Sequence, residues 1–234
     1  MIAIPDMVVV GTDTGVGKSV VSLLLMQLLF TEGLTPFYLK PFQTGCRSVL
    51  DPDSDARFVY SHTPELQSLD PARSVIYCLP NPKAPYFAAR DARKSIDLSK
   101  VRQIVEQARR ICSPLVVEAA GGLLVPVTRQ ILAVDLIGQL HCRPLLVARA
   151  GLGTINHTLL SIEAMRCRKI TPMGIVFVDA SESPADPDLV AENMDAVEMF
   201  TDCRVGGVIP HVQNFRTPPQ AAYTALRNIV FGRD

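Results

Sequence analysis

Apolar stretches of strand length alternate with stretches of helical periodicity along most of the chain. The alternation begins with a strand over residues 7–12, a helix over about 17–32 and a strand over 36–40. Nearly continuous apolar strands that are separated by helices are typical of a mostly parallel sheet covered on both faces. We therefore predict an α/β fold, a mostly parallel sheet flanked by helices.

The same alternation continues toward the C-terminus. The further predicted strands are 114–118, 144–150, 173–179 and 205–210, and the further predicted helices are 101–111, 133–140, 154–166 and 221–231. The pattern weakens between residues 41 and 100, where the prolines of PNPKAP (80–85) remove backbone donors and favour a rigid, partly extended connection. We predict a single domain over residues 1–234, with an irregular excursion at about 41–100 that carries substrate contacts.

Composition and charge narrow the class of protein. A chain of 234 residues with 48% hydrophobic content is long enough for one large domain with a substantial core. Its 23 basic and 23 acidic residues cancel, so nucleic-acid binding is not expected. A secretion signal and an apolar run of membrane-spanning length are not seen, and the six cysteines are widely spread without a metal-binding spacing. We expect a cytoplasmic protein whose cysteines are reduced and mostly packed.

The segment GTDTGVGKS (11–19) follows an apolar strand and opens a helix. In this context backbone N–H groups and the positive end of the helix hold phosphate oxygens. Lys18 would neutralise the outer phosphates, and the Ser19 hydroxyl would coordinate Mg²⁺. Five residues, not four, separate Gly11 from Gly17, so the loop is a variant of the usual spacing. The alternative is a glycine-rich turn with an exposed lysine.

A second lysine, Lys40 in KPFQTG (40–45), stands at the end of the next predicted strand. The carboxyl ends of parallel strands converge on one ligand crevice, so Lys18 and Lys40 are expected to face the same phosphate-rich site. The alternative is a solvated charge at the end of a strand.

Carboxylates provide candidate ligands for a metal ion. Asp55 lies in DPDSDAR (51–57), and Glu118 ends the strand PLVVE before a Gly-Gly turn. Mg²⁺ is commonly held by one or two carboxylates with phosphates and water, so Ser19, Asp55 and Glu118 are candidate ligands. For Asp55 a helix cap is an equal alternative, and for Glu118 the alternative is a buried structural residue.

The segment GLGTINHT (151–158) joins a strand to a helix. Backbone donors near Thr154, Ile155 and Asn156 would receive a carboxylate or a phosphate, whereas the alternative is an ordinary helix capped by Thr154. The four histidines are scattered, which disfavours a histidine metal site and a Ser/His/Asp triad.

The ordered set GTDTGVGKS, KPFQTG, DSDA, PNPKAPYFAA, VEAAGGLLVP, GLGTINHT and GVIP resembles the dethiobiotin synthetases over positions 11–210. The resemblance implies a P-loop NTPase-like fold. It also implies a reaction in which ATP and Mg²⁺ drive the joining of CO₂ to 7,8-diaminononanoate, through a carbamate and a carbamic-phosphoric anhydride, to form a cyclic urea.

The resemblance further implies a role for each motif. Lys40 would stabilise the carbamate and the transferring phosphate, Lys18 the β- and γ-phosphates, and Thr44 would contact the substrate. Thr154–Asn156 would receive the substrate carboxylate across the interface of a homodimer, and Ser19, Asp55 and Glu118 would hold Mg²⁺. The positions implied around the nucleotide are Thr14, Gly15, Val16, Gly17, Lys18, Ser19, Val20, Asp55, Glu118, Ala119, Ala120, Gly121, Asp179, Pro210, His211 and Val212.

Two departures from the family pattern affect the nucleotide site. Ala119 stands in EAAGG where relatives commonly have EGAGG, and it is harmless where its backbone avoids the conformations that glycine alone tolerates well. Val178 precedes Asp179 where many relatives place an asparagine that reads the purine base. A valine offers no paired donor and acceptor, so we expect weaker ATP preference, or base contacts through Asp179 and the Pro210–Val212 backbone.

Three other classes of phosphate-loop protein are alternatives. A partitioning ATPase usually carries an additional early lysine in the loop, which Thr12-Asp13-Thr14 lacks. An amide ligase of cofactor biosynthesis typically needs a glutamine-hydrolysing domain, for which 234 residues leave little room. A non-catalytic nucleotide-binding regulator would leave Lys40 and Thr44 without roles.

Overall fold

The computed structural model describes residues 4–232, and within this range a seven-stranded sheet forms in which every strand pair is parallel. The strands are β1 (Met7–Gly11), β2 (Phe37–Thr44), β3 (Val75–Leu79), β4 (Leu115–Gly122), β5 (Arg143–Arg149), β6 (Gly174–Val178) and β7 (Val205–Ile209). Their order across the sheet is β3-β2-β4-β1-β5-β6-β7. The expected α/β fold with a parallel sheet is confirmed.

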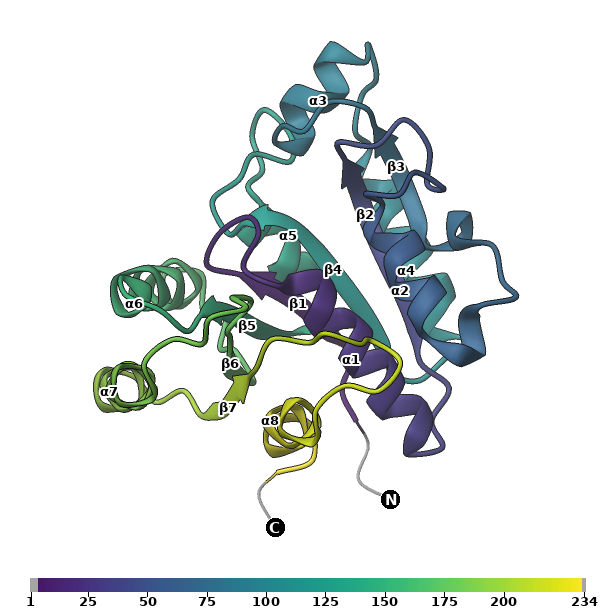
Figure 1. Ribbon diagram of the computed structural model, residues 1–234. Helices are drawn as coiled ribbons and strands as arrows, with labels where there is room; N and C mark the ends of the chain where they lie inside the picture. The colour runs from purple at the N-terminus through teal and green to yellow at the C-terminus, as the bar shows by residue number, and fades with distance from the viewer. Residues whose placement is uncertain (1–3, 233–234) are drawn as a thin grey trace.

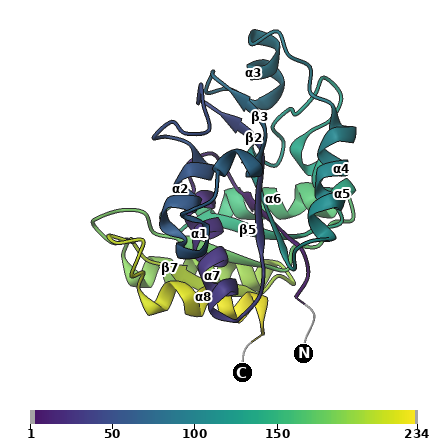
Figure 2. The same cartoon turned by 90° about the vertical axis from the view of Figure 1, so that its right-hand side faces the viewer.

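Helices cover both faces of this sheet (Figures 1 and 2). The α-helices are α1 (Lys18–Thr31), α2 (Asp55–His62), α3 (Pro85–Asp91), α4 (Leu98–Arg109), α5 (Ala133–Leu140), α6 (Thr154–Arg166), α7 (Pro187–Phe200) and α8 (Gln220–Val230). One apolar core joins the sheet to α1, α2 and α8, and a second core on the opposite face joins it to α4, α5, α6 and α7. The central strands are therefore buried on both sides, whereas the edge strand β3 is only partly buried.

Helix α1 is central to the first core. Its sequence is apolar around most of its circumference, and the segment Leu23–Leu29 is buried throughout. This burial is possible because α2 and α8 both pack against α1. The helix ends before Gly33, whose φ of +74° suits glycine at a helix C-terminus.

The excursion predicted as irregular is more regular than expected. It contains α2, β3, α3 and two short 3₁₀ helices, Pro64–Leu66 and Pro71–Ser74. Strand β2 also continues beyond its predicted end, through Pro41 to Thr44, because its pairing with β4 covers residues 37–39 and pairing with β3 takes over from Lys40. Pro41 lies at this change of partner, where its missing N–H is tolerated. Helix α7 was likewise not predicted.

The carboxyl ends of the strands meet at one edge of the sheet. Helix α3 lies beyond the ends of β2 and β3, which brings the excursion close to the phosphate loop (Figure 1). No helix among residues 4–232 is long and apolar enough to cross a lipid bilayer.

Candidate active site

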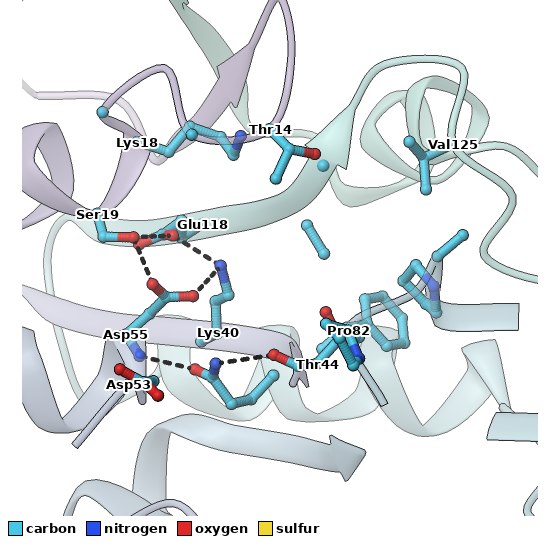
Figure 3. A pocket seen from close by; sticks show the side chains of 18 of the residues that line it. Thr14, Lys18, Ser19, Lys40, Thr44, Asp53, Asp55, Pro82, Glu118 and Val125 are labelled. Carbon is cyan, nitrogen blue, oxygen red and sulfur yellow. Dashed lines mark hydrogen bonds and ion pairs between the residues drawn. The ribbon is translucent and has the colours of Figure 1, made fainter. Parts of the chain in front are cut away.

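A cavity of about 620 Å³ opens at the carboxyl ends of β2 and β4, beside the phosphate loop that follows β1 (Figure 3). The residues that line it are Thr14, Gly15, Gly17, Lys18, Ser19, Val20, Lys40, Phe42, Gln43, Thr44, Asp53, Asp55, Pro82, Lys83, Ala84, Pro85, Glu118, Ala120, Gly121, Val125, Val178 and Ala180. The structure therefore brings Lys18, Lys40, Asp55 and Glu118 into one cavity, although Lys18 and Glu118 are 100 positions apart in the sequence.

The phosphate loop turns sharply between β1 and α1. Gly15 and Gly17 have φ angles of +70° and +100°, which residues with a side chain rarely adopt. Lys18 Nζ donates to the Asp13 carbonyl oxygen at 2.7 Å and so folds back over the loop. Burial, with a further contribution from the charge of Lys40, lowers the pKa of Lys18 to about 8. Anionic phosphate oxygens would favour its charged form, so the loop suits an anionic ligand.

Four side chains form a tight cluster beside this loop: Ser19, Lys40, Asp55 and Glu118, here called the carboxylate cluster (Figure 3). Ser19 Oγ donates to Asp55 Oδ1 at 2.6 Å and lies 2.8 Å from Glu118 Oε1. Lys40 Nζ lies 2.6 Å from Glu118 Oε1 and 2.8 Å from Asp55 Oδ2. The four side chains thus lie within hydrogen-bond distance of one another's partners, although they come from four elements: α1, β2, β4 and the start of α2.

The position of Asp55 is set by its helix. Ser54 caps α2 by accepting a hydrogen bond from Arg57 N at 3.3 Å, so the cap considered for Asp55 is supplied by its neighbour. Asp55 N donates to Gln43 Oε1 at 3.0 Å, which ties the helix start to β2. The Asp55 carboxylate is left to join the cluster.

The charges in the cluster stabilise one another. Burial alone would lower the pKa of Lys40, but Glu118 and Asp55 outweigh it and raise that pKa above its ordinary value. Burial alone would raise the pKa of Asp55, but Lys40 outweighs it and the pKa falls below its ordinary value. Lys40 and Asp55 are therefore both charged at neutral pH.

The donor set of the cluster suits a hard divalent cation. Ser19, Asp55 and Glu118 present only oxygen atoms, and the contact of both carboxylates with the Lys40 ammonium shows that positive charge is accommodated here. Within residues 4–232, no group of three or more His, Cys, Asp or Glu side chains is arranged to hold a metal ion. A cation in this cluster would therefore need further ligands from phosphate and water, as Mg²⁺ commonly has.

Several lining residues were not singled out from the sequence. They are Phe42, Gln43, Asp53, Pro82, Lys83, Ala84, Pro85, Val125 and Ala180. Phe42 and Gln43 lie inside the motif that was read for Lys40 and Thr44, and residues 82–85 lie inside the proline-rich connection. The sequence motifs therefore indicate which segments line the site, but they do not show which individual side chains of those segments face the cavity.

Some expected nucleotide residues do not line this cavity. They are Val16, Ala119, Asp179, Pro210, His211 and Val212. The side chains of Val16 and Val212 are buried in the core, so their backbone alone is suited to ligand contact. Asp179 accepts hydrogen bonds from Ser181 N at 3.2 Å and Ala185 N at 2.8 Å, so its carboxylate is engaged in shaping the loop after β6.

The start of α6 also lies apart from the cavity. Thr154, Ile155 and Asn156 are not among its lining residues, and Thr154 instead borders a smaller pocket on the other side of the phosphate loop. The helix is capped by Gly153 with a left-handed backbone, and Thr154 is its first residue, so the Thr154 cap considered above is not formed. Within one chain, these three residues and Lys40 do not share a cavity.

The substitution at Ala119 is tolerated by the backbone. Among residues 4–232, the non-glycine residues with positive φ are Arg93, His141 and Lys169, so Ala119 adopts an ordinary conformation. The left-handed position in this turn is Gly121, with a φ of +69°. The glycine that relatives commonly place at 119 is therefore not required here.

Comparison with known proteins agrees with this geometry. A family model described as an AAA domain matches residues 6–218. The ATP-dependent dethiobiotin synthetase BioD of Rhodopseudomonas palustris (strain BisA53) is 38% identical, over 96% of this chain and 95% of that protein. The protein of the same description from Halalkalibacterium halodurans is 32% identical, over 93% of this chain and 89% of that protein.

Solved structures with much lower identity share the fold. The MinC:MinD cell division complex of Aquifex aeolicus gives a TM-score of 0.63 at 10% identity, with 98% of this chain and 96% of that chain covered. The septum site-determining protein MinD of Pyrococcus horikoshii gives 0.58 at 13% identity, with 96% and 95% covered. These similarities concern the fold alone. The near-complete match to curated relatives, together with the phosphate loop and the carboxylate cluster, shows that the chain belongs to the ATP-dependent dethiobiotin synthetase family.

Proposed function

We propose that this chain is a ligase that uses a nucleoside triphosphate to join CO₂ to 7,8-diaminononanoate and close the ring of dethiobiotin. The observation that carries the proposal is the placement of Lys40 and Thr44 in the same cavity as the phosphate loop. A protein that only binds or hydrolyses a nucleotide has no need for a second lysine on β2.

The phosphate loop holds the nucleotide in this proposal. Backbone N–H groups at the start of α1 and the Lys18 ammonium face the β- and γ-phosphates. Ser19, Asp55 and Glu118 hold Mg²⁺, which supplies charge neutralisation for the phosphates when it is bound. The oxygen-only donor set of these three residues supports this assignment.

Lys40 stabilises the second anion. An amine of the substrate takes up CO₂ and loses a proton to give a carbamate, and a carbamate oxygen then accepts the γ-phosphoryl group, releasing the nucleoside diphosphate. The second amine attacks the carbonyl of this mixed anhydride and loses a proton, phosphate leaves, and the cyclic urea is complete. The buried Lys40 ammonium offsets the charge of the carbamate and of the transferring phosphoryl group in a site of low dielectric.

The far end of the substrate is received by a second copy of the chain. Thr44 contacts the diamine from the end of β2, and backbone donors of Thr154, Ile155 and Asn156 in the partner receive the carboxylate. The absence of all three residues from the lining of the Lys40 cavity, while Thr154 borders a separate pocket, supports a homodimer. The strong exposure of Leu152 (91%) and Leu160 (62%), beside and on α6, supports an interface on this surface.

A cytoplasmic location belongs to the same proposal. All six cysteines are free, which suits a reducing compartment. Among the described residues, no cysteine lines the cavity. Burial also raises the pKa of the Cys142 thiol to about 12. A cysteine nucleophile is therefore not part of the proposed reaction.

Phosphate release tests the proposal. We expect wild-type protein with ATP and Mg²⁺ to release phosphate when both the diamine and bicarbonate are present, and little when either is omitted. In Lys40→Ala the rate of this stimulated phosphate release should fall by about a hundredfold or more, because one preorganised charge that stabilises the transition state is removed. Lys100→Ala removes a lysine from the surface of α4 and should behave as wild type. ATP hydrolysis that does not depend on the diamine and is unchanged in Lys40→Ala would instead identify a nucleotide-binding regulator.

A further inference from the structure

Tyr38 lies on β2 two residues before Lys40, so both side chains leave the same face of the sheet. On the neighbouring strand β4, Val116 pairs with Tyr38, and Glu118 follows two residues later on the same face. Tyr38 and Glu118 are each 1% exposed, and Tyr38 belongs to the core that contains α1. The Tyr38 hydroxyl thus reaches the carboxylate cluster from inside the protein.

The two oxygens of Glu118 have different partners. Oε1 faces Lys40 Nζ at 2.6 Å and Ser19 Oγ at 2.8 Å, on the side of the cavity. Oε2 accepts a hydrogen bond from Tyr38 Oη at 2.8 Å, on the side of the core. The Tyr38 bond restrains rotation of the carboxylate and leaves Oε1 directed at the cavity. Because a phenol is a neutral donor, it does so without adding a positive charge that would compete with a bound cation.

We propose that Tyr38 is a positioning residue for the reaction, which acts by holding Glu118 in the orientation that a divalent cation requires. The inference rests on the proposed function, since it takes Glu118 as a cation ligand. Groups that orient a metal ligand typically change metal affinity by about 10–100-fold when they are removed. The same change is expected when the Tyr38 hydroxyl alone is lost.

Tyr38→Phe removes this hydroxyl and keeps the ring that packs in the core. Binding of Mn²⁺ can be followed by electron paramagnetic resonance in the presence of β,γ-methylene-ATP, without any turnover. We expect the Kd for Mn²⁺ to rise by about 10-fold or more, with cooperative thermal unfolding retained. In the Glu118→Gln background, adding Tyr38→Phe should cause little further loss, because the hydroxyl acts through the carboxylate.

Tyr60→Phe is the matched control. Tyr60 is also buried, but its hydroxyl bonds to Ser74 Oγ at 2.7 Å. We expect this variant to keep the wild-type Kd for Mn²⁺. An equal loss in Tyr60→Phe, loss of cooperative unfolding in Tyr38→Phe, or additive losses in the double variant would show a general packing role and overturn the inference.

Glu118→Gln distinguishes a failure of the positioning role of Tyr38 from a failure of the proposed cation site. If it weakens Mn²⁺ binding while Tyr38→Phe does not, the positioning role of Tyr38 is wrong and the proposed function stands. If Glu118→Gln itself binds Mn²⁺ as wild type does, Glu118 is not a cation ligand, and that part of the proposed function fails along with the inference.

Discussion

At the scale of single residues, Gly17 is a position where both backbone and packing exclude a side chain. Its φ is +100°, and an added Cβ would lie 2.8 Å from Val178 Cγ1. We predict that Gly17→Ala lowers nucleotide affinity by about tenfold or more, because a side chain at positive φ costs roughly 1–2 kcal/mol and each 1.4 kcal/mol is tenfold in binding. Calorimetric titration with ATP and Mg²⁺ measures this change.

Gly33 offers the control for backbone strain alone. Its φ is +74°, but an added Cβ would meet no atom within 4 Å. Gly33→Ala should therefore lower the free energy of unfolding by about 1 kcal/mol and leave nucleotide affinity unchanged. If Gly17→Ala binds ATP as tightly as wild type does, the close approach of Val178 to Gly17 does not restrict the phosphate loop, and the prediction is wrong.

Val178 is also the residue that bears on base preference. It is 4% exposed, lines the cavity and packs toward Gly17 with an apolar side chain. An apolar contact discriminates weakly between bases that differ in hydrogen-bonding groups, whereas a site built to pair with those groups discriminates strongly. We predict comparable turnover of ATP, GTP and CTP under saturating diamine, measured as dethiobiotin formed.

Val178→Asn should shift that preference toward ATP by supplying an amide donor and acceptor. Strict ATP dependence of the wild-type chain, with a direct contact to the base from another side chain, would contradict the prediction. The Asp179 carboxylate already accepts two backbone hydrogen bonds in its own loop, which makes the Pro210–Val212 backbone the better candidate for such a contact.

At the scale of elements, Asp135 joins the start of α5 to the segment after α6. Asp135 Oδ2 accepts from Leu132 N at 3.0 Å, and Oδ1 accepts from Arg168 Nε at 2.5 Å. The Arg168 hydrogen bond lowers the pKa of Asp135 below its ordinary value. We predict that Asp135→Asn lowers the free energy of unfolding by about 1 kcal/mol near neutral pH, as expected for a partly exposed pair combined with a helix cap.

The pH dependence of this difference follows from the sign of the shift. A depressed pKa in the folded state stabilises the protein above the unfolded value of about 4, and this stabilisation is lost as the pH falls through the folded value. Urea unfolding of both proteins should therefore show a difference that is constant near pH 7 and shrinks below about pH 4. Glu163→Gln, which breaks an exposed pair with Arg166, is the control and should change little. A difference that does not vary with pH would exclude a role for the Asp135 charge.

Periodicity predicted some elements to the residue and missed others for physical reasons. Helices α5 and α6 match their predicted ranges, because each carries apolar residues at helical spacing between clear strands. Helix α2 is short and largely polar in pattern, and β3 is a partly buried edge strand between proline-containing turns, so neither was distinct from loop. Local pattern does not reveal that β2 exchanges one strand partner for another at Pro41.

The site was predictable where charged residues follow apolar runs. Lys40 and Glu118 do so, which favours the ligand crevice over the core. The predicted strand ends at these residues are wrong, because β2 continues to Thr44 and β4 to Gly122, and both side chains are buried within their strands. The sequence leaves Asp55 open between a metal ligand and a helix cap, because Asp51, Asp53 and Ser54 crowd the same turn, and in the structure Ser54 supplies the cap. Tyr38 reads as an ordinary strand residue, since its hydrogen bond to Glu118 depends on the register of β2 against β4.

At the scale of the whole molecule, the sheet order separates the two parts of the proposed substrate site. Lys40 is on β2, whereas α6 follows β5, and β4 and β1 lie between those two strands. Figure 1 shows α6 and the β2–β3 edge on opposite sides of the phosphate loop. This separation supports the proposal that a diamine bound at Lys40 meets the start of α6 of a second chain.

This arrangement predicts that two inactive variants restore one another. Lys40→Ala removes the ammonium from one chain, and Asn156→Pro removes the Asn156 N–H at the start of α6, where proline is tolerated in the first turn. In a heterodimer of the two variants, one site carries both defects and the other carries neither. Purified heterodimers with two different tags should form dethiobiotin at about half the wild-type rate, because a two-fold dimer has two equivalent sites.

Each variant alone should be much less active. Heterodimers no more active than either parent would place Lys40 and the α6 start in the same chain's site, and the proposed crossing of the interface would then be wrong.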